Sequence, residues 1–157
     1  MKRFLGGLLV VAVSLAAVAG GVLLLQSRDD ADVGGGGAGP GDKVAARCPG
    51  RPAGVTRDAR PLSEDQIRQA VSLGNVVLRY RGARPPAPLR ALQQELTGPF
   101  DAEIAAAGQA IVLASGGEGV EALAWGRRLR ARTPEDPELR TFAEAWLGEG
   151  APEPCRS

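Results

Sequence analysis

The chain has 157 residues with a formal net charge of +1, and 44% of them are hydrophobic, which is enough for one modest core. This near-neutral balance disfavours a nucleic-acid partner, because domains that bind nucleic acids carry a strong basic excess. The chain contains no histidine. Histidine is the commonest zinc and copper ligand and the usual general base near neutral pH, so we expect no metal, no cofactor and no hydrolase triad.

An apolar segment runs from Phe4 to Leu25, directly after Lys2 and Arg3. As a helix it would reach about 33 Å, against a hydrocarbon core of about 30 Å. The positive-inside rule keeps the basic amino terminus in the cytoplasm. The sequence therefore predicts a transmembrane anchor over residues 1–27, with the rest of this single-pass protein outside the cytoplasmic membrane.

A cleaved signal peptide is the alternative, because Ala17-Val18-Ala19 has the small-x-small spacing of a processing site. Cleavage there would leave the apolar residues Val22 to Leu25 exposed at the new amino terminus, whereas an anchor uses them to complete its span. Both alternatives deliver the following domain to the same side of the membrane.

Glycine dominates the segment after the anchor, with an almost unbroken run from Gly34 to Gly41. Such composition is typical of a flexible tether, which we assign to residues 28–47. Residues 48–157 then amount to one extracytoplasmic domain.

The first regular element of this domain is predicted from its caps. Ser63 is a suitable N-cap, Gln66 occupies the capping-box position, and Gly74 is a typical stop signal, which together predict a helix between them. The β-prone stretch from Asn75 to Tyr80 is predicted to form an interior strand.

The middle of the chain predicts two helices and two strands. Leucines at positions 89, 92 and 96 share one helix face, and a shorter helix covers residues 101–107. Strands are predicted at Ala110 to Ala114 and, across the turn Gly116 to Gly119, at Val120 to Trp125. The second strand is inferred from its hairpin-like spacing.

The last helix has Asp136 as N-cap, Pro137 at the first position and Gly148 as its stop. Its apolar residues follow the helical period: Leu139, Phe142, Ala143, Trp146 and Leu147. The whole order predicts an α+β domain with packed helices on a small mixed sheet of about three strands. We expect Trp125, Phe142 and Trp146 to fill its core.

The two cysteines, Cys48 and Cys155, stand near opposite ends of the predicted domain. In an oxidising compartment they are expected to form a disulfide that closes a loop of about a hundred residues. Redox catalysis is disfavoured, since the chain has no Cys-x-x-Cys motif.

Three pairs of acidic residues could supply carboxylate chemistry: Glu64 and Asp65, Glu118 and Glu121, and Glu135 and Asp136. All lie at predicted turns or helix starts, where acidic residues are favoured for structural reasons. Capping therefore explains them better than catalysis does.

The densest charge cluster is formed by Arg127, Arg128, Arg130 and Arg132. It could hold an anionic lipid headgroup or an acidic envelope protein at the outer membrane face. The structural alternative is a solvated edge whose arginines pair with Glu135, Asp136 and Glu138.

Three segments carry a resemblance to a known family: Leu73 to Tyr80, Ala122 to Arg127, and Ala151 to Pro154. They are similar to the bacterial domain of unknown function 3105 family, over roughly Gln66 to Pro154. The residues that match its motifs are Gly74, Tyr80, Trp125, Gly126, Pro152 and Glu153. The resemblance implies one amino-terminal membrane anchor followed by an outward domain.

The chain departs from that family before the first predicted strand, where relatives usually read Leu-Glu-His-Gly and this chain reads Val71-Ser72-Leu73-Gly74. Any role of the family's histidines cannot operate here. We expect a non-catalytic binding or assembly module at the outer face of the cytoplasmic membrane. The alternative is an envelope enzyme that uses carboxylates and arginines, and it would require a cleft with convergent acids.

Overall fold

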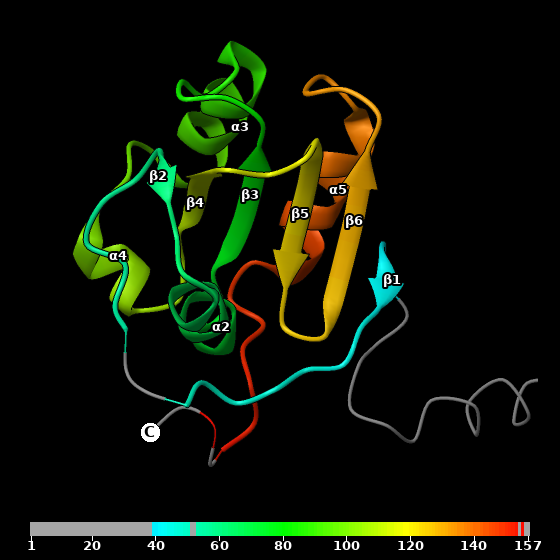
Figure 1. The fold of residues 1–157 in the computed structure, drawn as a ribbon. Coiled ribbons are helices and arrows are strands. Elements are labelled where there is room, and N and C mark those ends of the chain that lie inside the picture. The colour runs from blue at the N-terminus through cyan, green and yellow to red at the C-terminus, as the bar shows by residue number, and fades with distance from the viewer. Residues whose placement is uncertain (1–38, 51–52, 154, 156–157) are drawn as a thin grey trace, which may run out of the picture. The chain divides into compact units, whose positions relative to one another are not determined.

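The computed structural model describes residues 39–50, 53–153 and 155, and this part of the chain forms a six-stranded mixed sheet with four helices, an α+β fold (Figure 1). The strands are β1 (Asp42–Lys43), β2 (Arg60–Pro61), β3 (Val76–Tyr80), β4 (Ile111–Ser115), β5 (Val120–Ala124) and β6 (Arg127–Ala131). The helices are α2 (Glu64–Leu73), α3 (Ala87–Thr97), α4 (Ala102–Ala106) and α5 (Pro137–Trp146).

The prediction of a sheet of about three strands is wrong, because β1, β2 and β6 were missed. β1 and β2 are only two residues long, too short for any hydrophobic period to show in the sequence. β6 alternates arginine with Leu129 and Ala131, and its charge obscured its strand character. The predicted transmembrane helix lies outside the described residues, and none of the helices described is long and apolar enough to cross a membrane.

The strand order is β1-β6-β5-β3-β4-β2. β3 pairs in parallel with β4, as does β2, whereas the pairs β3–β5, β5–β6 and β6–β1 are antiparallel. Residues 120–124 are a strand as predicted, but they do not form a hairpin with β4. The loop after β4 passes the end of β3, where Gly117 N–H donates to the carbonyl of Tyr80 at 3.0 Å, and β5 then pairs with the far side of β3.

Local capping chemistry forms the helices where the sequence predicts them. Ser63 and Gln66 make both hydrogen bonds of a capping box at the start of α2. Gly74 ends this helix at φ 113°, a left-handed conformation that side chains disfavour. At α5, the Asp136 side chain accepts a hydrogen bond from the Glu138 N–H at 3.1 Å.

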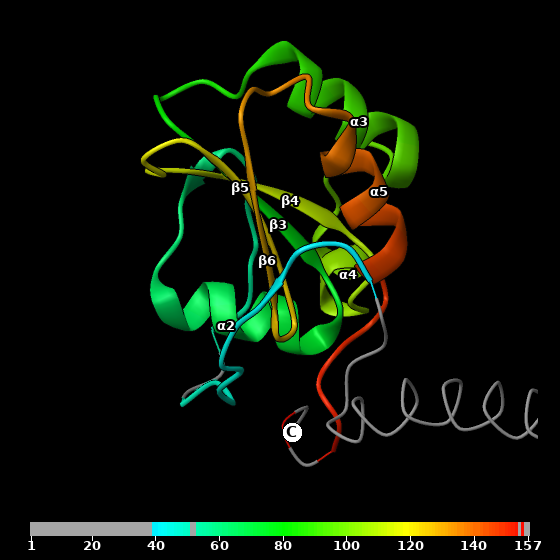
Figure 2. The same ribbon diagram turned by 90° about the vertical axis from the view of Figure 1, so that its right-hand side faces the viewer.

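Helices cover both faces of the sheet (Figure 2). On one face, α3 and α5 bury the main core, which includes Leu78, Leu89 and Phe142. On the other face, α2 packs over a smaller cluster that includes Val71, Val77 and Val112. Of the three aromatic residues predicted for the core, Phe142 and Trp146 lie in the main core, and Trp125 is half-buried against the smaller cluster.

Residues 39–47, which the sequence assigned to the linker, belong to the folded unit. The Trp146 indole N–H donates to the carbonyl of Pro40 at 2.8 Å, and Val44 N–H donates to Gly126 at 3.0 Å. A Cβ on Gly41 would meet the Phe142 ring at 2.6 Å, so only glycine fits this close approach. The predicted disulfide between Cys48 and Cys155 is present.

Candidate functional site

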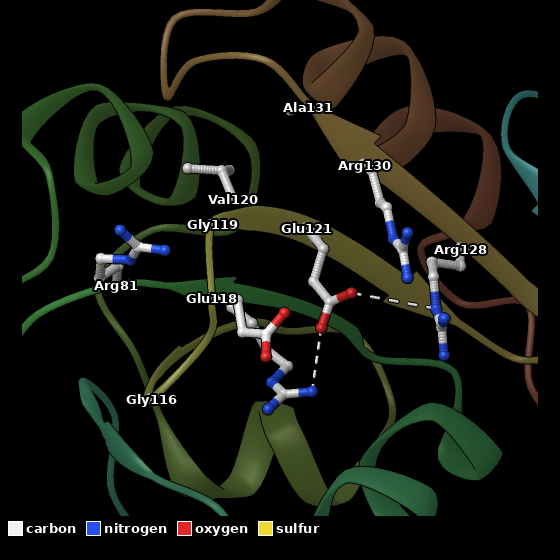
Figure 3. A pocket seen from close by; sticks show the side chains of 10 residues that line it. Arg81, Gly116, Glu118, Gly119, Val120, Glu121, Arg128, Arg130 and Ala131 are labelled. Atoms are coloured by element: carbon white, nitrogen blue, oxygen red, sulfur yellow. Dashed lines mark hydrogen bonds and ion pairs between the residues drawn. The ribbon is translucent and has the colours of Figure 1, made fainter.

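The main candidate site is a charged hollow on the sheet face that carries α2, in the part of this face beyond the helix. It has a volume of about 690 Å³. Its charged lining residues are Arg79, Arg81, Glu118, Glu121, Arg128 and Arg130 (Figure 3). We call this hollow the arginine groove. Its four arginines exceed its two glutamates, so it carries a positive excess.

Strand register builds the arginine groove. Glu121 on β5 is the register partner of Arg79 on β3 and of Arg130 on β6. Because side chains alternate between faces, these three residues project from the same face as Val77, which packs under α2. Three adjacent strands thus place one carboxylate, that of Glu121, between the guanidinium groups of Arg79 and Arg130.

The groove is only partly neutralised from within. Arg79 Nη1 lies 2.9 Å from Glu121 Oε1, and Arg128 Nε lies 3.9 Å from Glu121 Oε2. The Nε atom of Arg128 is buried and has no hydrogen-bond partner among the described residues. Arg81 and Arg130 form no ion pair within the described part of the chain. Figure 3 shows the side chains of Arg128 and Arg130 on the same side of the Glu121 carboxylate.

The structure separates the four arginines of the predicted patch. Arg128 and Arg130 line the groove, whereas Arg127 lies on the opposite sheet face, 5% exposed, with its guanidinium carbon 4.7 Å from the centre of the Trp146 ring. Arg132 follows the end of β6, where its backbone N–H donates to Asp136 Oδ2 at 3.2 Å.

The acidic partners also differ from the structural alternative. Within the described residues, Arg128 and Arg130 make no ion pair with Glu135, Asp136 or Glu138, and the carboxylate that lies near Arg128 is that of Glu121. Sequence reasoning did note Glu121, as one member of a pair with Glu118. It missed Arg79 and Arg81, whose approach to the cluster depends on strand pairing.

A second polar cluster surrounds the Asp58 carboxylate, whose side chain is 8% exposed. It forms an ion pair with Arg90 Nη1 at 2.6 Å and accepts hydrogen bonds from Gln93 Nε2 at 3.0 Å and from the backbone N–H of Leu113 at 2.9 Å. Gln93 also donates to the carbonyl of Ile111 at 2.8 Å. These contacts satisfy backbone groups of β4 beyond the end of β2, so the cluster has a structural role.

The hydroxyl of Tyr80 is buried on the same face of the sheet as α3 and has no hydrogen-bond partner within the described part of the chain. Burial raises the pKa of this phenol, and the negative charge of Asp58 adds to the effect, while Arg90 and, more weakly, the nearby Ser115 side chain oppose it. Tyr80 is therefore a buried, neutral side chain, and it points away from the arginine groove.

Other residues singled out in the sequence lie apart from the groove. A Cβ on Gly74 would lie 2.9 Å from the backbone of Gly148, so this glycine permits close chain packing. Gly126, at φ 67°, forms the β5–β6 turn together with Trp125. Pro152 and Glu153 are exposed near the carboxyl terminus.

Comparison of the chain with protein-family models, with curated proteins and with solved structures finds no match in any of the three. The family resemblance of the three segments therefore stays a prediction, and no residue role is transferred from it.

Proposed function

We propose that this protein is a non-catalytic binding or assembly module that receives an acidic partner protein in its arginine groove. The observation that carries the proposal is the arrangement of Arg79, Arg128 and Arg130 around the single carboxylate of Glu121. An incoming anionic group would relieve the mutual repulsion of these guanidinium groups and form charge-assisted hydrogen bonds with them.

Several features favour a protein partner over a lipid surface. Stable attachment to a membrane surface usually combines basic residues with apolar side chains that insert below the headgroups. The apolar residues of the groove are only Val120 and Ala131, and both are half-buried. The one large exposed hydrophobic residue in the described chain is Ile104, which lies on α4.

The place of action rests on the sequence. The apolar segment Phe4 to Leu25 supports a position at the outer face of the cytoplasmic membrane, with an envelope protein as the partner. The enzyme alternative has weaker support, because Glu121, one of the two acids in the groove, is already paired with Arg79.

The test is photo-crosslinking in living cells from a crosslinking amino acid at Val120, which lines the groove. The parent is compared with the double variant Arg128→Glu/Arg130→Glu and with the control Arg57→Glu/Arg60→Glu. The control changes the charge equally, at exposed residues near the opposite sheet edge. We expect a discrete protein adduct in the parent and the control, and a loss of about tenfold or more in the groove variant.

Two outcomes would contradict the proposal. An adduct that consists of lipid, and that disappears in the groove variant, would assign the groove to the membrane surface. A protein adduct that is equally strong in all three proteins would show that the arginines do not recognise the partner.

A further inference from the structure

The outer edge of β6 is covered over only part of its length. β1 pairs with Arg127 and Arg128 alone, through Lys43 and Asp42. Beyond Arg128, no described strand lies beside β6 on that side, and Figure 1 shows β1 next to only one half of it. In the described part of the chain, residues 129–131 therefore form an open sheet edge.

The backbone of Arg130 faces this open edge. β5 and β6 are joined by the two-residue turn Trp125–Gly126, so the flanking pair Ala124 and Arg127 exchanges hydrogen bonds. The pattern alternates along the ladder, which directs the N–H and C=O groups of Arg128 and Arg130 away from β5. The Arg128 groups meet β1, where a Cβ on Gly41 would lie 2.9 Å from the Arg128 carbonyl oxygen. Among the residues that the structure describes, no strand lies beside the Arg130 groups.

The same residue thus offers a backbone edge and a side chain that lines the groove. An extended chain placed beside β6 would project every second side chain over the groove face, at intervals of about 7 Å. Arg128 and Arg130 repeat with the same spacing, since they are two residues apart on one strand. Because Asp42 of β1 already occupies the position beside Arg128, an acidic side chain of the added chain would lie opposite Arg130 and reach Arg128 only diagonally.

We propose that an acidic, extended segment of the partner protein adds to β6 as a further strand next to Arg130. This inference rests on the proposed function, and it specifies the conformation of the partner. Strand addition supplies affinity through the main chain and specificity through alternate side chains. A second copy of this chain is a poor occupant, because antiparallel self-pairing around Arg130 would place arginines opposite each other.

The test measures fluorescence anisotropy of two labelled peptides with the purified full-length protein. In the plain peptide Glu alternates with Val, and the methylated peptide has the same sequence with a methyl group on every backbone nitrogen. Both have the same charge, but the methylated peptide has no backbone N–H groups and cannot donate to the edge of β6. We expect the plain peptide to bind about tenfold more tightly.

Two protein variants separate the backbone edge from the charge. Arg130→Ala removes the guanidinium, and Arg130→Pro removes the guanidinium together with the outward N–H, which β5 does not use. We expect Arg130→Pro to weaken the plain peptide about fivefold more than Arg130→Ala does, and the methylated peptide to respond equally to both variants. Circular dichroism and thermal unfolding confirm that both variants are folded.

The outcomes distinguish the two proposals. Equal affinity of both peptides for the parent, with the same loss in both variants, would overturn strand addition and leave anion binding in the groove intact. If neither peptide binds the parent and crosslinking finds no acidic partner, the proposed function fails as well.

Discussion

The two edges of the sheet are both covered by a very short strand, but they differ in what covers the neighbouring strand beyond it. Each outermost strand is only two residues long: β2 lies beside β4, and β1 lies beside β6. Beyond β2, side chains take over the role of a strand, since Asp58 accepts from the N–H of Leu113 and Gln93 donates to the carbonyl of Ile111. Beyond β1, no side chain of the described residues takes over this role for the backbone groups of Arg130.

This difference indicates where a partner can bind. An open edge favours unwanted pairing, and proteins commonly protect it with charged residues or a covering segment. Here one edge is sealed with a buried network at the cost of ordering three polar side chains, while the other carries arginines at its open end. An edge protected by arginines repels basic strands and attracts acidic ones.

The largest expected effect comes from the disulfide, because the segment that carries both short edge strands is tied to the carboxyl terminus at Cys48. The loop between Cys48 and Cys155 spans 107 residues. Replacing both cysteines by serine should lower the free energy of unfolding by about 4 kcal/mol, through the greater entropy of the unfolded chain. Urea denaturation of the double variant measures this change.

Hydrogen exchange shows whether removing the disulfide destabilises both edges of the sheet. We expect faster exchange at the N–H groups of Val44 and Ala59, which bond to Gly126 and Leu113 respectively. Treating the parent with a reductant should reproduce the effect and serves as the control. An unchanged denaturation midpoint in the variant would show that the edges are held without the disulfide.

The next effect concerns the sealed edge itself. Asp58→Ala removes the ion-pair partner of Arg90 and the acceptor of the Leu113 N–H, and it leaves this buried N–H without its partner. The free energy of unfolding should fall by about 3 kcal/mol. Asp42→Ala is the matched control, since Asp42 is an exposed aspartate on the other edge strand, and it should change stability by less than about 0.5 kcal/mol. Equal effects of the two substitutions would remove the distinction between the edges.

The sequence was most informative where the determinants are local. The capping box of Ser63 and Gln66 and the N-cap Asp136 with Pro137 predicted the starts of α2 and α5, because these contacts span only a few residues. The disulfide was also predictable, since only two cysteines are present. The strands β1 and β2 could not be predicted, because two residues carry no period and their pairing partners are distant in sequence.

The arginine groove depends on non-local register. Arg79 and Glu121, which form its central ion pair, are 42 residues apart, and only the pairing of β5 with β3 brings them together. Arg127 illustrates the consequence of missing β6. Once this strand is known, the alternation of side chains between the two sheet faces places Arg127 on the face opposite to Arg128 and Arg130. Without β6, the four arginines looked like one surface patch.

The smallest expected effect concerns the hydroxyl of Tyr80, which lies near the polar cluster that seals the β4 edge. The Tyr80 hydroxyl lies buried near Asp58 without a hydrogen-bond partner in the described chain. Tyr80→Phe removes this unsatisfied group and should raise the free energy of unfolding by about 1 kcal/mol at neutral pH. Urea denaturation measures the gain, and a loss of stability would instead show that the hydroxyl is bonded, for example through water.

The pH dependence supplies a second readout for the same residue. Burial, with Asp58 adding to it, raises the Tyr80 pKa in the folded protein, so the folded state holds this proton at pH values where the unfolded chain has lost it. The Tyr80 contribution to stability is therefore constant below the unfolded value of about 10 and decreases as the pH rises above it. Tyr80→Phe should lack that alkaline decrease. Because the chain contains a single tyrosine, tyrosinate absorbance in the parent reports Tyr80 directly. An ordinary tyrosine titration curve in the folded parent would mean that solvent reaches the hydroxyl, and that the network around Asp58 closes the β4 edge less tightly than its hydrogen bonds indicate.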